Sequence, residues 1–298
     1  MPSTRDIRRR IKSVKNTAQI TKAMQLVAAS KMKKAQDQAT AGRSYADLLN
    51  EVLVNLKDQT EPEAHPLLEE REDGKELLLL ITTDKGLCGG LNTNLLRKVQ
   101  NEVAEDATIV TIGSKGRRSM VRLKRDLLAD FHIHDPVPFS ETKLVSKFIM
   151  EQYEEGNFST VKVAFTNFIN TISQEPLVET LLPIRPIDLG RDKDYVGVGR
   201  DHEKVEVGSG AGPAGYLFEP GPESVLNTVV PLYVHNEIYQ MTLESRASEH
   251  SARMVAMKSA TDNANDLIKD LTLAYNKQRQ AAITAELLEI TTAMKALE

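Results

Sequence analysis

Residues 254–285 read MVAMKSATDNANDLIKDLTLAYNKQRQAAITA, and this stretch decides the fold class of the chain. Apolar or small side chains recur there at alternating steps of three and four residues, the spacing of a coiled-coil seam. The seam positions are Met254, Met257, Thr261, Ala264, Ile268, Leu271, Tyr275, Gln278, Ala282 and Ala285. The surrounding residues 232–298 contain neither proline nor glycine. We therefore predict a continuous helix of roughly 100 Å, at about 1.5 Å per residue.

A partner for this helix is predicted at the other end of the chain, where residues 3–56 contain no proline and a single glycine, Gly42. An apolar stripe runs along this segment and shifts frame once, which changes the winding of a supercoil. Its members are Ile7, Ile11, Val14, Ala18, Met24, Ala28, Met32, Ala35 and Ala39. We expect Gly42 to interrupt the helix and the prolines at 62 and 66 to end it. The two terminal helices predict an antiparallel coiled coil.

The middle of the chain has a different pattern, in which apolar runs of strand length alternate with helix-like segments. The runs are residues 77–83, 108–112, 127–134, 160–168 and 177–184, and the helix-like segments are 91–103, 115–124 and 141–155. This alternation predicts an open, mostly parallel, Rossmann-like α/β sheet. The last two strands are joined without room for a helix, so that edge is predicted to be antiparallel.

These patterns predict three parts: an N-terminal helix over residues 1–57, an α/β domain over 58–220, and a C-terminal helix over 221–298. Within the α/β domain, the glycine-rich residues 190–214 are predicted to form a flexible segment. The last helix is expected to begin at Pro222 or Glu223 and to kink at Pro231.

The net charge of -4 conceals an asymmetry along the chain. Residues 1–57 carry a net charge of +8, residues 58–231 carry -10, and residues 232–298 carry -2. A basic helix of this kind presents a solvated face, contacts nucleic acid or meets an acidic protein partner. The single cysteine excludes an internal disulfide. The first residues of the sequence are not followed by an apolar run of the signal-peptide type, and no apolar run has membrane-spanning length.

Two glycine-containing stretches follow predicted strands, where α/β sheets bind phosphates. They are TDKGLCGGLN at residues 83–92 and GSKG at residues 113–116. The spacing of the first fits neither the dinucleotide fingerprint nor the phosphate loop, so a phosphate site and a tight turn remain alternatives for both. His132 and His134 point to one face of a predicted strand, but no further Cys or His lies nearby. We expect no metal site and no catalytic residues.

Motifs along the whole chain resemble the gamma subunit of rotary F-type ATP synthases of the bacterial type. IRRRIKSVKNT at residues 7–17, QITKAM at 19–24 and VAASKM at 27–32 are similar to the start of that family. Further matches follow in order: GLCGGLN at 86–92, ARMVAM at 252–257, ATDNA at 260–264, YNK at 275–277 and RQAAIT at 279–284. The chain is therefore identified as a member of that family by resemblance.

The resemblance implies a central rotor stalk of a proton-translocating ATP synthase. In that family the coiled coil turns inside a ring of three alpha and three beta subunits. The α/β foot meets the epsilon subunit and the membrane ring of c subunits. Rotation of the c-ring then drives the conformational cycle of the catalytic beta subunits, and the gamma chain catalyses nothing itself. The chain is expected to bind no cofactor or nucleic acid, because Mg-ATP and ADP bind to the alpha and beta partners. It would lie peripherally, through the complex, on the cytoplasmic face of the cell membrane.

The same resemblance assigns candidate partner contacts. Met24, Arg253, Gln280 and Thr284 correspond to contacts with the acidic catch loop of beta, and Tyr216 and Glu219 to the foot over the c-ring and epsilon. An arginine with amide and hydroxyl neighbours suits carboxylate recognition. Met24 and Thr284 have the alternative of packing the coiled coil only. The competing function is a cytosolic coiled-coil adaptor with a nucleotide- or nucleic-acid-binding α/β head, which the ordered motifs at both ends oppose.

Overall fold

The computed structural model describes residues 3–57, 65–71, 74–184 and 218–297. Its helices are α1 (Thr4–Lys57), α2 (Leu91–Glu102), α3 (Ser114–Arg122), α4 (Phe139–Glu154) and α5 (Pro222–Leu297). Its strands are β1 (Lys75–Ile81), β2 (Thr108–Ile112), β3 (Leu127–Phe131), β4 (Phe158–Phe168) and β5 (Gln174–Leu182). The chain divides into two compact units, one formed by the residues up to Ala28 with those from Met254 onward, and the other by Ala29–Arg253.

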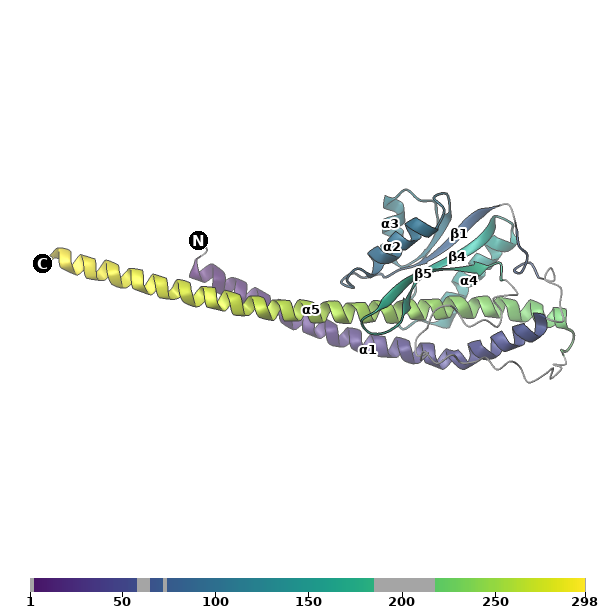
Figure 1. The fold of residues 1–298 in the computed structure, drawn as a ribbon, viewed down its shortest axis with the longest axis horizontal. Helices are drawn as coiled ribbons and strands as arrows, with labels where there is room; N and C mark the ends of the chain where they lie inside the picture. Colours follow the sequence, from purple (N-terminus) through teal and green to yellow (C-terminus); the bar gives the residue numbers. More distant parts are fainter. Residues whose placement is uncertain (1–2, 58–64, 72–73, 185–217, 298) are drawn as a thin grey trace. The chain divides into compact units, whose positions relative to one another are not determined.

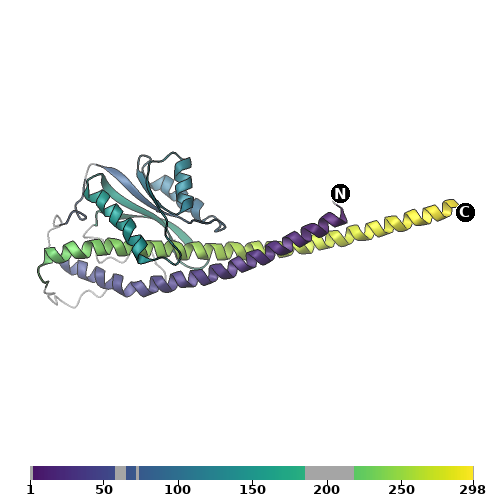
Figure 2. The same ribbon diagram turned by 180° about the vertical axis from the view of Figure 1, so that it is seen from behind.

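The first unit is an antiparallel helix pair in which the start of α1 lies beside α5 (Figures 1 and 2). Ile7 and Ala18 of α1 and Met257 and Ala264 of α5 are buried, as the two predicted stripes require. The Thr21 and Thr261 hydroxyl oxygens lie 2.7 Å apart across the seam. The predicted seam is confirmed as far as Gln278, whereas every residue from 279 to 295 is exposed.

The second unit contains a five-stranded sheet in the order β3-β2-β1-β4-β5. The first four strands are parallel and β5 pairs antiparallel with β4, which confirms the predicted antiparallel edge. Both faces of β1 are covered, because Leu78 and Leu80 pack with α2 and α3 while Leu77 and Leu79 pack with α4 and α5. This double coverage explains why β1 is a continuous apolar run.

Gly42 does not interrupt α1, so that prediction was wrong. A Cβ atom at Gly42 would lie 2.7 Å from Nε2 of Gln240 on α5, so the glycine leaves room for the end of that side chain. Helix α5 begins at Pro222, as predicted, and continues through Pro231. The predicted flexible segment, residues 190–214, and the proline at 62 lie outside the described residues.

Helix α4 and helix α5 are joined by a buried polar contact, in which His235 Nδ1 lies 2.5 Å from Ser146 Oγ. Burial lowers the pKa of His235, and the charge of Lys143 lowers it further. The folded chain therefore keeps this imidazole neutral at a pH where the unfolded chain, with an ordinary pKa of about 6.5, binds a proton.

Because the unfolded state binds more protons, the free energy of unfolding should fall as the pH drops through and below about 6.5. Replacing His235 with Gln removes this proton uptake and should flatten the decline. Urea denaturation of the wild type and His235→Gln between about pH 7.5 and pH 5 measures the difference. Equal declines in the two proteins would show that His235 does not contribute.

Candidate functional site

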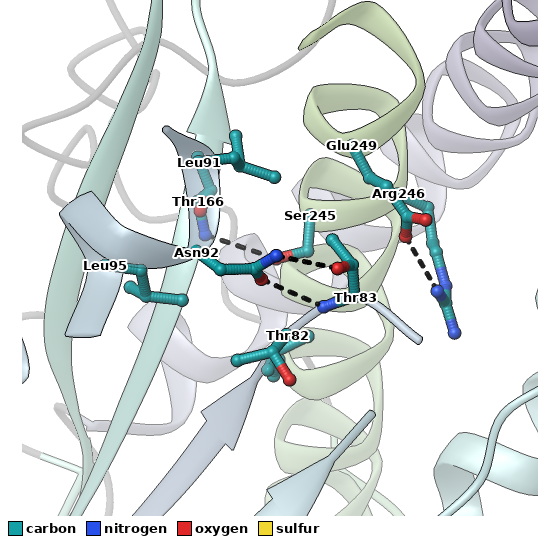
Figure 3. A pocket seen from close by; sticks show the side chains of 10 residues that line it. Thr82, Thr83, Leu91, Asn92, Leu95, Thr166, Ser245, Arg246 and Glu249 are labelled. Atoms are coloured by element: carbon teal, nitrogen blue, oxygen red, sulfur yellow. Dashed lines mark hydrogen bonds and ion pairs between the residues drawn. The ribbon is translucent and has the colours of Figure 1, made fainter. Parts of the chain in front are cut away.

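The strand order places a topological switch point between β1 and β4, since β2 and β4 lie on opposite sides of β1. Ligands of doubly wound sheets bind at this point, outside the carboxyl ends of the strands. In this chain helix α5 passes through that position (Figure 3). Only a small pocket remains there, lined by Ile81, Thr82, Thr83, Leu91, Asn92, Leu95, Thr166, Ser245, Arg246 and Glu249.

Polar side chains of α5 bind the backbone of β4 where β4 extends beyond its pairing with β1. The Thr166 backbone N–H donates to Ser245 Oγ at 3.1 Å, and Ser248 Oγ donates to the Thr166 carbonyl at 3.0 Å. The Phe168 N–H donates to a Glu244 carboxylate oxygen at 3.4 Å. Buried backbone groups need such partners, so α5 completes the hydrogen bonding of the strand.

The N-terminus of α3 is also occupied by the chain itself. The Ser114 N–H donates to Asp84 Oδ1 at 3.0 Å, and the Gly116 N–H donates to Thr82 Oγ1 at 2.8 Å. A Cβ atom at Gly113, where φ is +97°, would lie 2.2 Å from the Thr82 carbonyl oxygen. The Asp84 carboxylate thus fills a place that a phosphate would take at a helix N-terminus. These contacts favour the tight-turn interpretation of residues 113–116.

Two arginines of α5 share one buried carboxylate. Arg246 Nη1 lies 2.8 Å from Glu249 Oε2, and Arg253 Nη2 lies 2.7 Å from Glu249 Oε1. Arg246 also reaches Asp84 Oδ2 at 3.3 Å and donates to the Ile133 carbonyl at 2.9 Å. Burial alone would lower the pKa of Arg246, but Glu249 and Asp84 outweigh it and raise that pKa. The cluster therefore keeps Arg246 charged.

A second group of charges lies around Asp135, just after β3. Lys31 Nζ on α1 lies 2.7 Å from Asp135 Oδ2, and His250 Nε2 on α5 lies 3.1 Å from the same oxygen. Although 3.1 Å is an ion-pair distance, the His250 nitrogen lacks the alignment of a hydrogen bond. The contact with His250 is the largest cause that holds the pKa of Asp135 well below its usual range. Lys31 also lowers this pKa, whereas burial raises it. Asp135 thus binds groups of α1 and α5 at once.

The residues assigned by family resemblance are distributed between the two units. Met24 is half-buried, and Gln280 and Thr284 are exposed one helical turn apart, where Thr284 Oγ1 donates to the Gln280 carbonyl at 2.9 Å. Arg253 belongs to the other unit, where it is 8% exposed and bound to Glu249 and to the Gly86 carbonyl. Gln280 and Thr284 therefore lie together on the exposed part of α5, whereas Arg253 lies in the buried cluster.

At the predicted foot, Glu219 is exposed and Tyr216 lies outside the described residues. Sequence reasoning missed Asp84, Arg246 and Glu249 as members of a site. The spacing of Arg246, Glu249 and Arg253, at steps of three and four on one helix, was the available signal.

The part of the chain that the structure describes contains no helix long and apolar enough to cross a membrane. Nor does it contain a group of three or more His, Cys, Asp or Glu side chains placed to hold a metal ion.

Comparisons with known proteins give consistent similarities over the full length. A family model described as ATP synthase matches residues 3–297. The chain is 50% identical over 293 residues to the ATP synthase gamma chain of Opitutus terrae, covering 98% of both chains. It is 48% identical over 298 residues to the ATP synthase gamma chain of Akkermansia muciniphila, covering 100% of both.

Two solved structures have similar folds. One is a chain of the central stalk and c-ring of the Tetrahymena thermophila mitochondrial ATP synthase, with a TM-score of 0.58 and 27% identity, covering 81% of this chain and 99% of that chain. The other is a chain of the Euglena gracilis mitochondrial ATP synthase, with a TM-score of 0.65 and 20% identity, covering 99% of this chain and 94% of that chain.

The buried cluster predicts a large effect for Arg246→Met, which keeps an unbranched stem and removes the charged guanidinium. Glu249 and Asp84 would each lose a buried partner, and we expect the free energy of unfolding to fall by about 3–5 kcal/mol. Chemical denaturation measures the loss. Lys269→Met is the matched control, because Lys269 pairs with Asp266 on an exposed part of α5 and its replacement should leave stability unchanged. Similar losses in both variants would contradict the prediction.

Proposed function

The chain belongs to the family of ATP synthase gamma chains, the central rotor stalk subunits of that enzyme, and we propose that it transmits torque without catalysing any reaction itself. Rotation of the membrane c-ring would enter through the α/β unit and leave through the coiled coil toward the catalytic subunits. A proton crossing the membrane releases about 2.3 kcal/mol per charge for each 100 mV. The chain would carry that energy as mechanical work.

The observation that carries this proposal is the polar attachment of α5 within the sheet unit. Hydrophobic contacts are non-directional, so a helix held by them alone can slide or turn. Hydrogen bonds and ion pairs have preferred distances and angles. Residues 244–253 of α5 make such bonds to β4, to the loop after β1 and to the end of β3. These contacts suit a helix that must turn together with its head.

The exposed end of α5 supports an enclosing partner. Beyond residue 278 its large apolar side chains have no cover in the chain that the structure describes, and they are 50–64% exposed. They are Ile283, Leu287, Leu288, Ile290 and Met294. Apolar surface of this extent marks interaction sites. We assign the alpha and beta subunits as the partners here, with three of each around one copy of this chain, and epsilon and c subunits at the foot.

The proposed mechanism uses the asymmetry of the shaft. A helix pair presents a different face to each of three otherwise identical beta subunits, and any difference in contact biases the affinity of each nucleotide site. Mg-ATP and ADP would bind to the alpha and beta subunits only. As part of the complex the chain is peripheral to the membrane, and we place it on the cytoplasmic face of the cell membrane.

The alternative function, an adaptor with a nucleotide- or nucleic-acid-binding head, is less well supported. Its nucleotide would need the crevice at the switch point, and α5 fills that crevice with Ser245, Arg246 and Glu249. Its nucleic acid would need the basic N-terminal helix, part of which packs in the coiled coil. Neither observation favours such a ligand.

Native mass spectrometry of the tagged chain, isolated from its own membranes in mild detergent, tests the assembly. We expect one copy of this chain bound to three alpha and three beta subunits, since the rotor is asymmetric within a threefold ring. A chain recovered free, or bound mainly to nucleic acid, would support the adaptor instead.

A double variant, Arg253→Ala with Gln280→Leu, tests the proposed contact with the acidic catch loop of beta. Loss of a guanidinium and an amide should weaken carboxylate binding and uncouple hydrolysis from transport. We expect ATP-driven proton pumping in membrane vesicles to fall further than ATP hydrolysis does. Gln280→Leu alone is the matched control. Gln280 is exposed and lies outside the buried cluster, so a loss of pumping in this single variant does not come from damage to that cluster. Normal pumping by the double variant would exclude this contact.

A further inference from the structure

We propose that His132 and His134 together bind one Zn²⁺ ion through their Nε2 atoms, at the end of strand β3. The two residues follow β3 directly, with Ile133 between them. Ile133 is 2% exposed, whereas the side chains of His132 and His134 are 66% and 72% exposed. Extended chain places alternate residues on the same side, so the two imidazoles share the solvent side.

The separation of the two rings matches that of two ligands on one ion. Their centres lie 5.3 Å apart with an angle of 74° between the ring planes. Zinc binds a histidine nitrogen at about 2.0–2.1 Å with tetrahedral geometry, which puts the centres of two rings on one ion roughly 5 Å apart. The spacing of the rings therefore matches that of two ligands on one ion.

Carboxylates face the opposite nitrogen of each ring. His134 Nδ1 lies 2.8 Å from Glu141 Oε1, and the His134 backbone N–H donates to Glu141 Oε2 at 2.8 Å. His132 Nδ1 lies 3.6 Å from Asp84 Oδ1. Histidines that bind metals usually donate their second ring N–H to a carboxylate, which leaves the other nitrogen as the ligand. His134 has this arrangement, whereas the 3.6 Å between His132 Nδ1 and Asp84 is longer than a hydrogen bond.

The chemistry of the site selects the class of ion. Imidazole nitrogen favours zinc, copper and nickel over magnesium and calcium, and water can complete the coordination of a site with two protein ligands. The nearby Glu141 carboxylate adds attraction for a cation, whereas Asp84 and Asp135 are already paired with Arg246 and Lys31. The site departs from the sequence expectation of no metal, because Asp84 and Glu141 come close to the histidines only when the chain folds.

Titration of the full-length chain with Zn²⁺ in a calorimeter tests the proposal, with Mg²⁺ as the ion that should not bind. We expect His132→Ala and His134→Ala each to remove one bound Zn²⁺ per chain, and the double variant to lose no more than either single variant. This equality distinguishes one shared ion from two independent histidines. Glu141→Gln should retain the ion with an affinity about tenfold lower.

Cu²⁺ added in place of Zn²⁺ gives a second measurement, because its electron paramagnetic resonance spectrum reports the coordinating nitrogens. Two imidazole nitrogens in the wild type, and loss of this two-nitrogen signal in each single variant, would support the site. Unchanged Zn²⁺ binding in the variants, or losses that add in the double variant, would overturn it and leave an edge-on contact between aromatic rings. Circular dichroism of each variant confirms that these exposed replacements keep the fold.

Discussion

The charges of helix α5 must be neutralised where the helix crosses the carboxyl ends of β1 and β4, and the arrangement of the sheet unit depends on this constraint. An isolated buried charge is strongly unfavourable, and a buried pair is tolerated only with good geometry. Arg246 and Arg253 both meet Glu249 on their own helix, and Arg246 also meets Asp84 after β1. Asp135 after β3 meets Lys31 of α1. Each neighbouring element thus supplies a charge at a fixed place.

Stability and positional specificity come from different parts of the same helix. Between residues 226 and 243, α5 buries apolar side chains against the core, including Val230, Val234 and Ile238. This half supplies the favourable free energy of burial, about 25 cal/mol per Å² of apolar surface. The following turns, residues 244–253, bury mainly polar and charged side chains. Their bonds are satisfied in one register only, so they fix how far along and at what rotation α5 lies against the sheet.

Much of the fold was predictable because periodicity is a local property of the sequence. Strand β2 was predicted at its observed bounds, 108–112. A strand that is buried on both faces of the sheet has a nearly continuous run of apolar residues, which can be recognised in the sequence. The prediction at Gly42 was wrong because one glycine weakens a helix by only about 1 kcal/mol, and α1 continues through it. The part of the buried cluster that lies off α5 was not predictable, because Asp84 and Arg246 are 162 residues apart and meet only through the sheet topology.

The filled crevice connects the fold to the function of the family. The carboxyl ends of parallel strands and the start of the following helix present backbone groups that have lost their ladder partners, and in many α/β proteins a polar ligand binds them. Here Ser245 and Ser248 bind the backbone of Thr166, and Asp84 binds the first N–H of α3, as the oxygens of a ligand would. A helix that serves as the ligand cannot dissociate. The same hydrogen bonds that would hold a nucleotide in another doubly wound protein therefore attach the shaft helix to its head in this one.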